Sequence, residues 1–199
     1  MINPVPIELN LNNLKDVFEK IICLETFIFY GTLLGYQRNG NIIPNDDDVD
    51  IFINFKQLDL LLEALDLINF KVKIMPTRSW FSWQKKPLIV QATRVQKGIP
   101  TFVDFYLYDD EPIDHLEEKW NFLGQWKNPM TALHIPKHLI FPIQDVYMQG
   151  ININIPAYPE KTCEFLYGSG WKTPLKKNEQ YTISIENHVP VLKMKSKTL

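Results

Sequence analysis

The chain has little cysteine, little arginine and no excess of positive charge. Its two cysteines, Cys23 and Cys163, stand far apart in apolar surroundings, which excludes a disulfide framework and a cysteine-ligated zinc cluster. We expect both to be buried free thiols. The formal net charge of -2 at pH 7 gives no general electrostatic footprint for nucleic acid, and only a local basic groove would be compatible with that partner.

Long uncharged hydrophobic runs are absent as well. No stretch approaches the ~18 apolar residues that a membrane span needs. Residues 1–20 lack the basic segment and apolar run of a secretory signal, so we expect a cytoplasmic protein. The 199 residues, 45% of them hydrophobic, predict one packed domain over residues 1–199 rather than two very small ones. The lysine-rich tail over 188–199 is expected to fray.

Hydrophobic periodicity predicts an α+β fold, a mixed β-sheet with helices packed on it. Apolar residues three and four apart indicate a helix over residues 10–24, with Asn10 or Asn12 as its cap. Further helices are expected over 54–69 and 159–167. The expected strands are 27–30, 49–53, 70–75, 79–84, 88–96, 101–108, 144–148 and 151–155, with turns at Lys97-Gly98 and Gln149-Gly150.

Four aspartates fall within five positions in the segment GTLLGYQRNGNIIPNDDDVDIFI, residues 31–53. They are Asp46, Asp47, Asp48 and Asp50. Carboxylates clustered where a buried strand begins repel one another unless a positive charge neutralises them. A divalent metal ion that holds a phosphorylated substrate usually supplies this charge. Because hard oxygen ligands beside a phosphate select Mg²⁺ or Mn²⁺, one of these ions is the expected cofactor.

The geometry of an extended strand limits which aspartates share an ion. Alternate side chains point to the same face, which predicts that Asp46, Asp48 and Asp50 point together and Asp47 points away. Four residues of strand span about 13 Å, too far for one ion to bridge the two ends. Either Asp46 lies on a turn that folds back or Asp48 bridges two ions, and Asp48 with Asp50 is the preferred ligand pair.

Other interpretations of the acidic cluster fit the sequence less well. A calcium-binding EF-hand loop would need Gly and Glu where the chain has Ile51 and Gln57. A solvated acidic turn and a helix cap stay open, although the following Ile-Phe-Ile favours a strand. The turn Gly31–Gly35 just upstream either presents amide groups to a phosphate or is a turn without a ligand.

One more carboxylate stands out, because Asp104 lies in the apolar strand sequence TFVDFYLY, residues 101–108. A lone buried charge there would be costly, so Asp104 either joins the site or makes a structural hydrogen bond. The histidines show no metal-ligand spacing, and the tryptophans are interpreted mainly as packing residues. Trp80 and Trp83 would share one face of a strand over 79–84 and could border an acceptor site.

The pattern GTLLG-x-x-R-x-G-x-x-I-P-x-D-D-D-V-D resembles the signature of the LicD/fukutin family of nucleotidyltransferase-fold phosphotransferases. The resemblance spans about residues 25–175, a motif-bearing core. It continues in the same order through Thr93-Arg94, Val103–Tyr106, Phe141-Pro142, Ile155-Pro156, Tyr167-Gly168, Trp171 and Pro174. Two positions depart from the pattern, since Asn45 replaces a usual Trp and Tyr36 replaces a usual small residue.

The resemblance implies a nucleotidyltransferase-like mixed sheet and a Mg²⁺-dependent reaction. Similar family members move a phosphorylated small alcohol, of the phosphocholine or ribitol-phosphate type, from a CDP-activated donor to a sugar or glycan acceptor. The implied metal ligands are Asp46, Asp48, Asp50 and Asp104, and the implied catalytic residues are Asp48, Asp50 and Asp104. The implied substrate-binding residues are Gly31, Thr32, Gly35, Arg38 and Arg94.

Two alternatives remain beside this interpretation. The same fold could instead place an NMP group on a protein, a nucleic acid or a small molecule. A non-catalytic module that binds a metal and a nucleotide is the second alternative, against which the intact aspartates argue.

Overall fold

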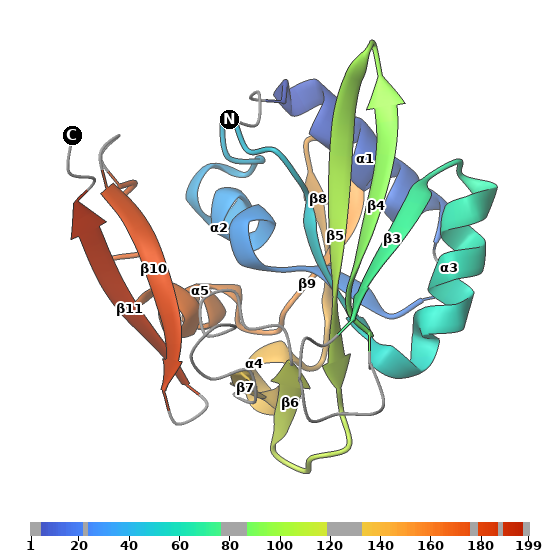
Figure 1. The fold of residues 1–199 in the computed structure, drawn as a ribbon. Helices are drawn as coiled ribbons and strands as arrows, with labels where there is room; N and C mark the ends of the chain where they lie inside the picture. Colours follow the sequence, from blue (N-terminus) through green and yellow to red (C-terminus); the bar gives the residue numbers. More distant parts are fainter. Residues whose placement is uncertain are drawn as a thin grey trace.

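A computed structural model describes residues 5–21, 24–76, 87–118, 133–175, 179–186 and 189–196 (Figure 1). The first part of the described chain consists of α1 (Ile7–Lys20), β1 (Thr26–Ile28), α2 (Tyr30–Asn39), β2 (Asp50–Asn54), a 3-10 helix (Phe55–Gln57), α3 (Leu58–Leu67), β3 (Lys71–Pro76), β4 (Pro87–Gln96) and β5 (Ile99–Asp109). The second part consists of β6 (His115–Glu118), β7 (Leu133–Pro136), α4 (Lys137–Ile140), β8 (Gln144–Met148), β9 (Ile151–Ile155), α5 (Pro159–Tyr167), β10 (Glu179–Glu186) and β11 (Val189–Ser196).

Seven of the described strands form one mixed sheet, which confirms the predicted α+β fold. Five of them follow the order β1-β2-β5-β4-β3, and β6 and β7 continue from β5. The pair β2 and β5 is parallel, whereas the other pairs in the sheet are antiparallel. The hairpins β8–β9 and β10–β11 are separate two-stranded sheets.

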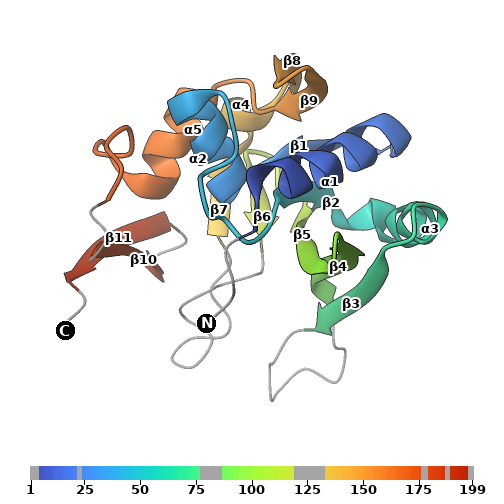
Figure 2. The same cartoon turned by 90° about the horizontal axis from the view of Figure 1, so that it is seen from above.

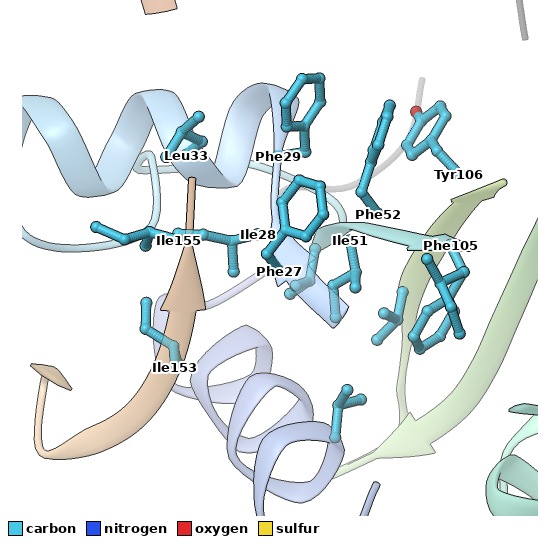
Figure 3. Close-up of a cluster of buried hydrophobic side chains, with 14 of the residues drawn as sticks. Phe27, Ile28, Phe29, Leu33, Ile51, Phe52, Phe105, Tyr106, Ile153 and Ile155 are labelled. Atoms are coloured by element: carbon cyan, nitrogen blue, oxygen red, sulfur yellow. The ribbon is translucent and has the colours of Figure 1, made fainter. Parts of the chain in front are cut away.

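The two faces of the sheet are packed differently. Alternation along the strands sends Phe52 and Tyr106 to one side and Ile51 and Phe105 to the other (Figure 3). Helix α1 packs on β5 and β9 and lies on the Ile51 side. Burying each of these large apolar side chains stabilises the fold by about 1.5–3 kcal/mol.

The remaining helices lie around the edges of the sheet. Helix α2 packs on β2 and on α5, and α3 packs on β3. The β10–β11 hairpin packs on α5 and on strand β7, and α5 in turn packs on α2 (Figure 1, Figure 2). None of the helices in the described ranges is long and apolar enough to cross a membrane.

Several predicted elements are confirmed. The hairpin 144–148 with 151–155 and the helix 159–167 have the predicted bounds. At the predicted turn Lys97-Gly98, both residues have positive φ, 51° and 79°. Four predictions fall on residues that the structure does not describe: the strand 79–84, Trp80 and Trp83 within it, and the thiol of Cys23. The other thiol, Cys163, is buried and free, as predicted.

Two predictions about the ends of the chain are wrong. The first helix begins after Pro6, and neither Asn10 nor Asn12 caps it. Asn10 instead lies on the buried face of α1, where its side-chain amide donates hydrogen bonds to the carbonyls of Asp46 and Asp48. The tail over 189–196 forms strand β11 and pairs with β10 along its whole length. Its lysines alternate with apolar residues in the sequence, a two-residue period that suits a strand.

Candidate active site

Three consecutive aspartates, Asp46, Asp47 and Asp48, form an acidic loop that leads into β2. Each offers one carboxylate oxygen, and these oxygens lie within 4.8 Å of one another, so the acidic loop can hold a metal ion. The turn before it places Asn45 at a φ of 67°. Because asparagine adopts this left-handed backbone more readily than most residues, the turn gives a structural reason for Asn45.

The prediction that Asp47 points away from its neighbours is wrong. It assumed that the strand already includes residues 46–49, whereas β2 begins at Asp50. Side chains alternate between faces only within a strand. In the loop before the strand, the carboxylate of Asp47 therefore lies beside those of Asp46 and Asp48.

Asp50 is held in place through its backbone and its side chain. Its amide donates to Oγ1 of Thr32 at 2.8 Å, and its carbonyl accepts from the amide of Phe29 at 3.1 Å. Its Oδ2 accepts from the amide of Gly31 at 2.8 Å. The Gly31-Thr32 segment, which the family pattern links to a donor phosphate, thus positions Asp50 in this structure.

Asp104 lies beside Asp50 on the neighbouring strand. The two are register partners in the parallel pair β2–β5, so their side chains project from the same face of the sheet. Gln91, the partner of Asp104 on β4, donates a hydrogen bond from Nε2 to Oδ1 of Asp104 at 3.1 Å. Three adjacent strands therefore place Asp50, Asp104 and Gln91 side by side.

Burial and mutual repulsion raise the pKa of four carboxyl groups in the site. Burial, followed by the charge of Asp47, raises the pKa of Asp46 to about 6. Burial, followed by the charges of Asp46 and Asp104, raises the pKa of Asp48 to about 8. Burial raises the pKa of Asp104 to about 6 despite the hydrogen bond from Gln91, and burial followed by neighbouring carboxylates also raises the pKa of Asp50.

No lysine or arginine in the described ranges forms an ion pair with these carboxylates. A divalent cation fits the donor set, because several carboxylate oxygens at close range suit a hard cation. Such an ion would also remove the repulsion that raises the pKa values.

Aromatic residues border the site. The rings of Tyr30 and Tyr106 meet edge to face, with centroids 4.7 Å apart. The hydroxyl of Tyr30 donates to Oε2 of the buried Glu118 at 3.3 Å. Burial raises the pKa of Tyr30, Tyr106 and Tyr167, and the charge of Asp50 adds to the shift in all three. These neutral rings lower the local polarity, which strengthens electrostatic interactions in the site.

Gly31 leaves space that the aspartates occupy. A Cβ at this position would lie 2.9 Å from Oδ2 of Asp50 and 3.2 Å from Oδ2 of Asp46. Both oxygens belong to side chains expected to bind metal. The glycine is therefore required by the close approach of the two carboxylates.

Gly31→Ala is expected to lower turnover by about 100-fold, because displacing reacting groups by a fraction of an ångström to an ångström costs about that much. Stability should not fall in parallel, since alanine favours a helix over glycine by about 1 kcal/mol. Steady-state kinetics and thermal melting would check both parts. Gly170→Ala is the matched control, because a Cβ there meets nothing within 4 Å. Wild-type kinetics in Gly31→Ala would contradict the assignment of Asp46 and Asp50 to the metal site.

The structure does not bring the other expected substrate-binding residues to the carboxylates. Gly35 packs against backbone, where a Cβ would lie 2.6 Å from the carbonyl oxygen of Asn41. Arg38 donates to the carbonyls of Trp171 and Thr173, at 2.7 and 3.2 Å. The contacts of both residues connect α2 to neighbouring loops.

Arg94 faces away from the acidic edge, which consists of Asp50, Asp104 and the acidic loop. It is three residues from Gln91 along β4, so the two side chains project from opposite faces of the sheet. On its own face Arg94 donates from Nε to Oδ1 of Asn13 at 2.7 Å and forms an ion pair with Asp16, both on α1. A substrate role for Arg94 has no geometric support in this arrangement.

Sequence reasoning missed Gln91, although a signal for it existed. A two-residue turn at Lys97-Gly98 makes Gln96 and Ile99 partners, and counting back along both strands makes Gln91 the partner of Asp104. No such local signal pointed to Tyr30 or Glu118, which are 88 residues apart in the sequence.

A mixed sheet that holds aspartates side by side on two parallel strands, next to a loop of three more, is an arrangement suited to the transfer of phosphate-containing groups. The chain belongs to the LicD/FKTN/FKRP family, whose nucleotidyltransferase domain matches residues 24–158. This confirms the family resemblance and makes the chain a transferase of the nucleotidyl- or phosphotransferase type.

Two further comparisons complete this result. No curated protein matches the chain. Among solved structures, it is similar to the lincomycin-bound lincosamide antibiotic adenylyltransferase LnuA, with 14% sequence identity over 78% of this chain and 82% of that chain and a TM-score of 0.49.

Proposed function

We propose that the protein transfers a phosphorylated small alcohol, of the phosphocholine or ribitol-phosphate type, from a CDP-activated donor to a sugar or glycan. The observation that carries this proposal is the acidic edge, in which Asp50 and Asp104 are register partners beside the acidic loop. Membership of the LicD/FKTN/FKRP family supports the choice of reaction class.

The proposed metal site consists of Asp46, Asp48, Asp50 and Asp104, and the position of Asp47 adds a fifth candidate oxygen. Bound Mg²⁺ or Mn²⁺ would neutralise the negative charge of the donor diphosphate. Asp50 has the most rigid support, through Gly31 and Thr32, and holds its ligand oxygen in a fixed position. Gln91 orients the carboxylate of Asp104.

In the proposed reaction an acceptor hydroxyl attacks the phosphorus that bears the alcohol. A new bond forms between the acceptor oxygen and this phosphorus, the bridging bond to the nucleotide phosphate breaks, and CMP leaves with the electron pair. The hydroxyl proton passes to a carboxylate. Asp104 either helps to hold a second metal ion or accepts this proton, and it can act as the base when Asp46, Asp48 and Asp50 hold the metal, because it projects beside Asp50 from the same face of the sheet.

Thermal melting with Mn²⁺ and a panel of CDP-alcohols, CTP and other nucleotides would identify the donor. A donor at a hundred times its dissociation constant adds about 2.7 kcal/mol, which raises the Tm of a domain of this size by roughly 5–10 °C. The proposal expects a metal-dependent shift with one CDP-conjugate. Mass spectrometry of the reacted acceptor should then show the added phosphoalcohol.

The other outcomes would replace this proposal by a named alternative. A shift with a plain NTP, followed by an acceptor carrying NMP, would favour nucleotidyl transfer. Binding of a nucleotide without turnover of any acceptor would favour a non-catalytic binding module. The matched control is the same titration in EDTA, which should remove a shift that depends on metal.

A further inference from the structure

Helix α1 precedes the part of the chain that matches the family domain, and yet it contacts the acidic loop. The family match begins at residue 24, whereas α1 ends at Lys20. Nδ2 of Asn10 donates to the carbonyl of Asp46 at 3.1 Å and to that of Asp48 at 3.4 Å. One amide group therefore holds the backbone at both ends of the acidic loop.

The burial of Asn10 is costly for the stability of α1. The side chain is fully buried, and its Oδ1 has no hydrogen-bond partner among the described groups. An unpaired buried amide oxygen costs free energy that an apolar side chain of similar size would not. The packing of α1 alone therefore does not account for an asparagine at this position.

A second set of polar contacts fixes α1 to the sheet. Oδ1 of the buried Asn13 accepts from Nε of Arg94 at 2.7 Å and from Nε2 of Gln96 at 2.8 Å. Nε2 of Gln96 also donates to the carbonyl of Leu9 at 3.0 Å. Arg94 in turn forms an ion pair with Asp16. The start of α1, and with it Asn10, is thus held against strand β4.

Strand β4 is also the strand that carries Gln91, which binds Asp104. The contacts therefore run from the acidic loop through Asn10 to α1, and from α1 through Asn13 and Arg94 to β4. This arrangement ties the acidic loop to β4, which pairs with β5, the strand that carries Asp104. Without it, repulsion among the aspartates would favour a loop whose carboxylates lie further apart.

We infer that Asn10 is a positioning residue of the metal site: it fixes the backbone of Asp46 and Asp48 so that their carboxylates converge on one ion. The inference rests on the proposed metal-dependent function. It also assigns a role to α1, since the helix supplies a support for the site from outside the matched domain.

The test compares Mn²⁺ binding by the full chain at pH 7.5, measured by isothermal titration calorimetry, with thermal melting of the same samples. Asn10→Leu keeps the size of the side chain and removes the donor. It should weaken Mn²⁺ binding at least tenfold, since loss of a group that orients metal ligands typically costs 10–100-fold in affinity. Its metal-free Tm should not fall, because the unpaired Oδ1 is removed as well.

Leu14→Ala is the matched control on the same helix. Leu14 is fully buried in the core, so its truncation should lower the Tm by more than any change at Asn10. Because the apolar side chain of Leu14 donates no hydrogen bond to the acidic loop, the Mn²⁺ affinity should stay within twofold of wild type. Should Asn10→Leu fail to fold, Asn10→Ala serves as the second variant with the same expected loss of affinity.

Kinetics give an independent readout. In Asn10→Leu the Mn²⁺ concentration for half-maximal turnover should rise at least tenfold, while kcat at saturating Mn²⁺ recovers most of its wild-type value. Wild-type Mn²⁺ affinity in Asn10→Leu, or an equal loss in Leu14→Ala, would overturn the inference alone. A wild-type protein that binds no Mn²⁺ would overturn the proposed metal site together with the inference.

Discussion

Asp48→Asn is expected to lower turnover by at least about 10³-fold while the protein keeps its fold. Asp48 belongs to the acidic loop and has neighbouring carboxylates in Asp46, Asp47 and Asp104. Replacing its carboxylate with an amide removes a charged ligand, and with it much of the affinity for a divalent cation. The loss should appear in kcat and in metal affinity together.

The fold should survive because asparagine resembles the protonated acid. With a pKa raised to about 8 by burial and by the charges of Asp46 and Asp104, Asp48 carries a proton over most of the neutral range in the metal-free protein. The amide introduced by the substitution has a similar shape and no charge, so the metal-free Tm at pH 7.5 should be equal to or higher than that of wild type.

Turnover with the donor identified by melting, together with the Tm with and without Mn²⁺, would check this prediction. Asp66→Asn is the matched control, because Asp66 is an exposed aspartate on α3, away from the acidic edge. It should leave both turnover and the Mn²⁺-dependent rise in Tm unchanged. A fully active Asp48→Asn enzyme would refute the proposed role of this carboxylate.

The second large effect concerns pH. Bound metal should abolish or reverse the decrease in the free energy of unfolding that we expect between pH 5 and 8 without metal. Without metal, the free energy of unfolding should fall as the pH rises. With saturating Mg²⁺ or Mn²⁺ it should stay level or increase. The difference in Tm caused by metal should therefore grow with pH and reach roughly 5–10 °C.

The sign follows from proton binding in the two states. An unfolded aspartate loses its proton near pH 4, whereas in the native state the pKa is about 6 for Asp46 and Asp104 and about 8 for Asp48. Between about pH 4 and pH 8 the native protein therefore holds more protons than the unfolded chain, and the free energy of unfolding decreases with rising pH. A bound cation favours the deprotonated carboxylates and removes this decrease.

Two other aspartates, Asp16 and Asp110, change the free energy of unfolding only at lower pH. Burial raises the pKa of Asp16, but the hydrogen bonds and charges of Arg94 and Lys20 together lower it below its ordinary value, and a hydrogen bond from Lys56 lowers the pKa of Asp110. Their stabilisation is complete above pH 4 and is lost only as the pH falls through their lowered values. Measurements from pH 5 upwards therefore avoid the titration of these two aspartates.

Melting curves in EDTA and in Mg²⁺ at half-unit intervals from pH 5 to pH 8 would make the comparison. Asp48→Asn should show a shallower decrease in EDTA and a smaller response to Mg²⁺. A metal-free Tm that rises steadily over this range would show that the carboxylates are not held together as the structure describes.

Local sequence signals predicted most elements of the fold, because a helix, strand or turn depends largely on residues that are close together in the chain. The two-residue turns at Lys97-Gly98 and Gln149-Gly150 fixed the hairpins around them, since turn length sets strand register. The run Ile51–Ile53 correctly indicated a buried strand. The prediction extended strand geometry back to Asp46, whereas β2 begins at Asp50, because acidic residues do not define where the hydrogen bonding of a strand begins; the error for Asp47 follows from this.

The sequence by itself determined the α+β class, the family and the set of carboxylates, because these are recorded in residue types and short spacings. Only the tertiary structure decided how the carboxylates are supported. It made Asp50 and Asp104 register partners across two strands, assigned Arg94 to α1 instead of a substrate, and brought Asn10 to the acidic loop. These contacts join residues 36 to 81 positions apart, and no local pattern encodes them, because the first depends on which strands become neighbours in the sheet and the other two depend on how α1 packs on it.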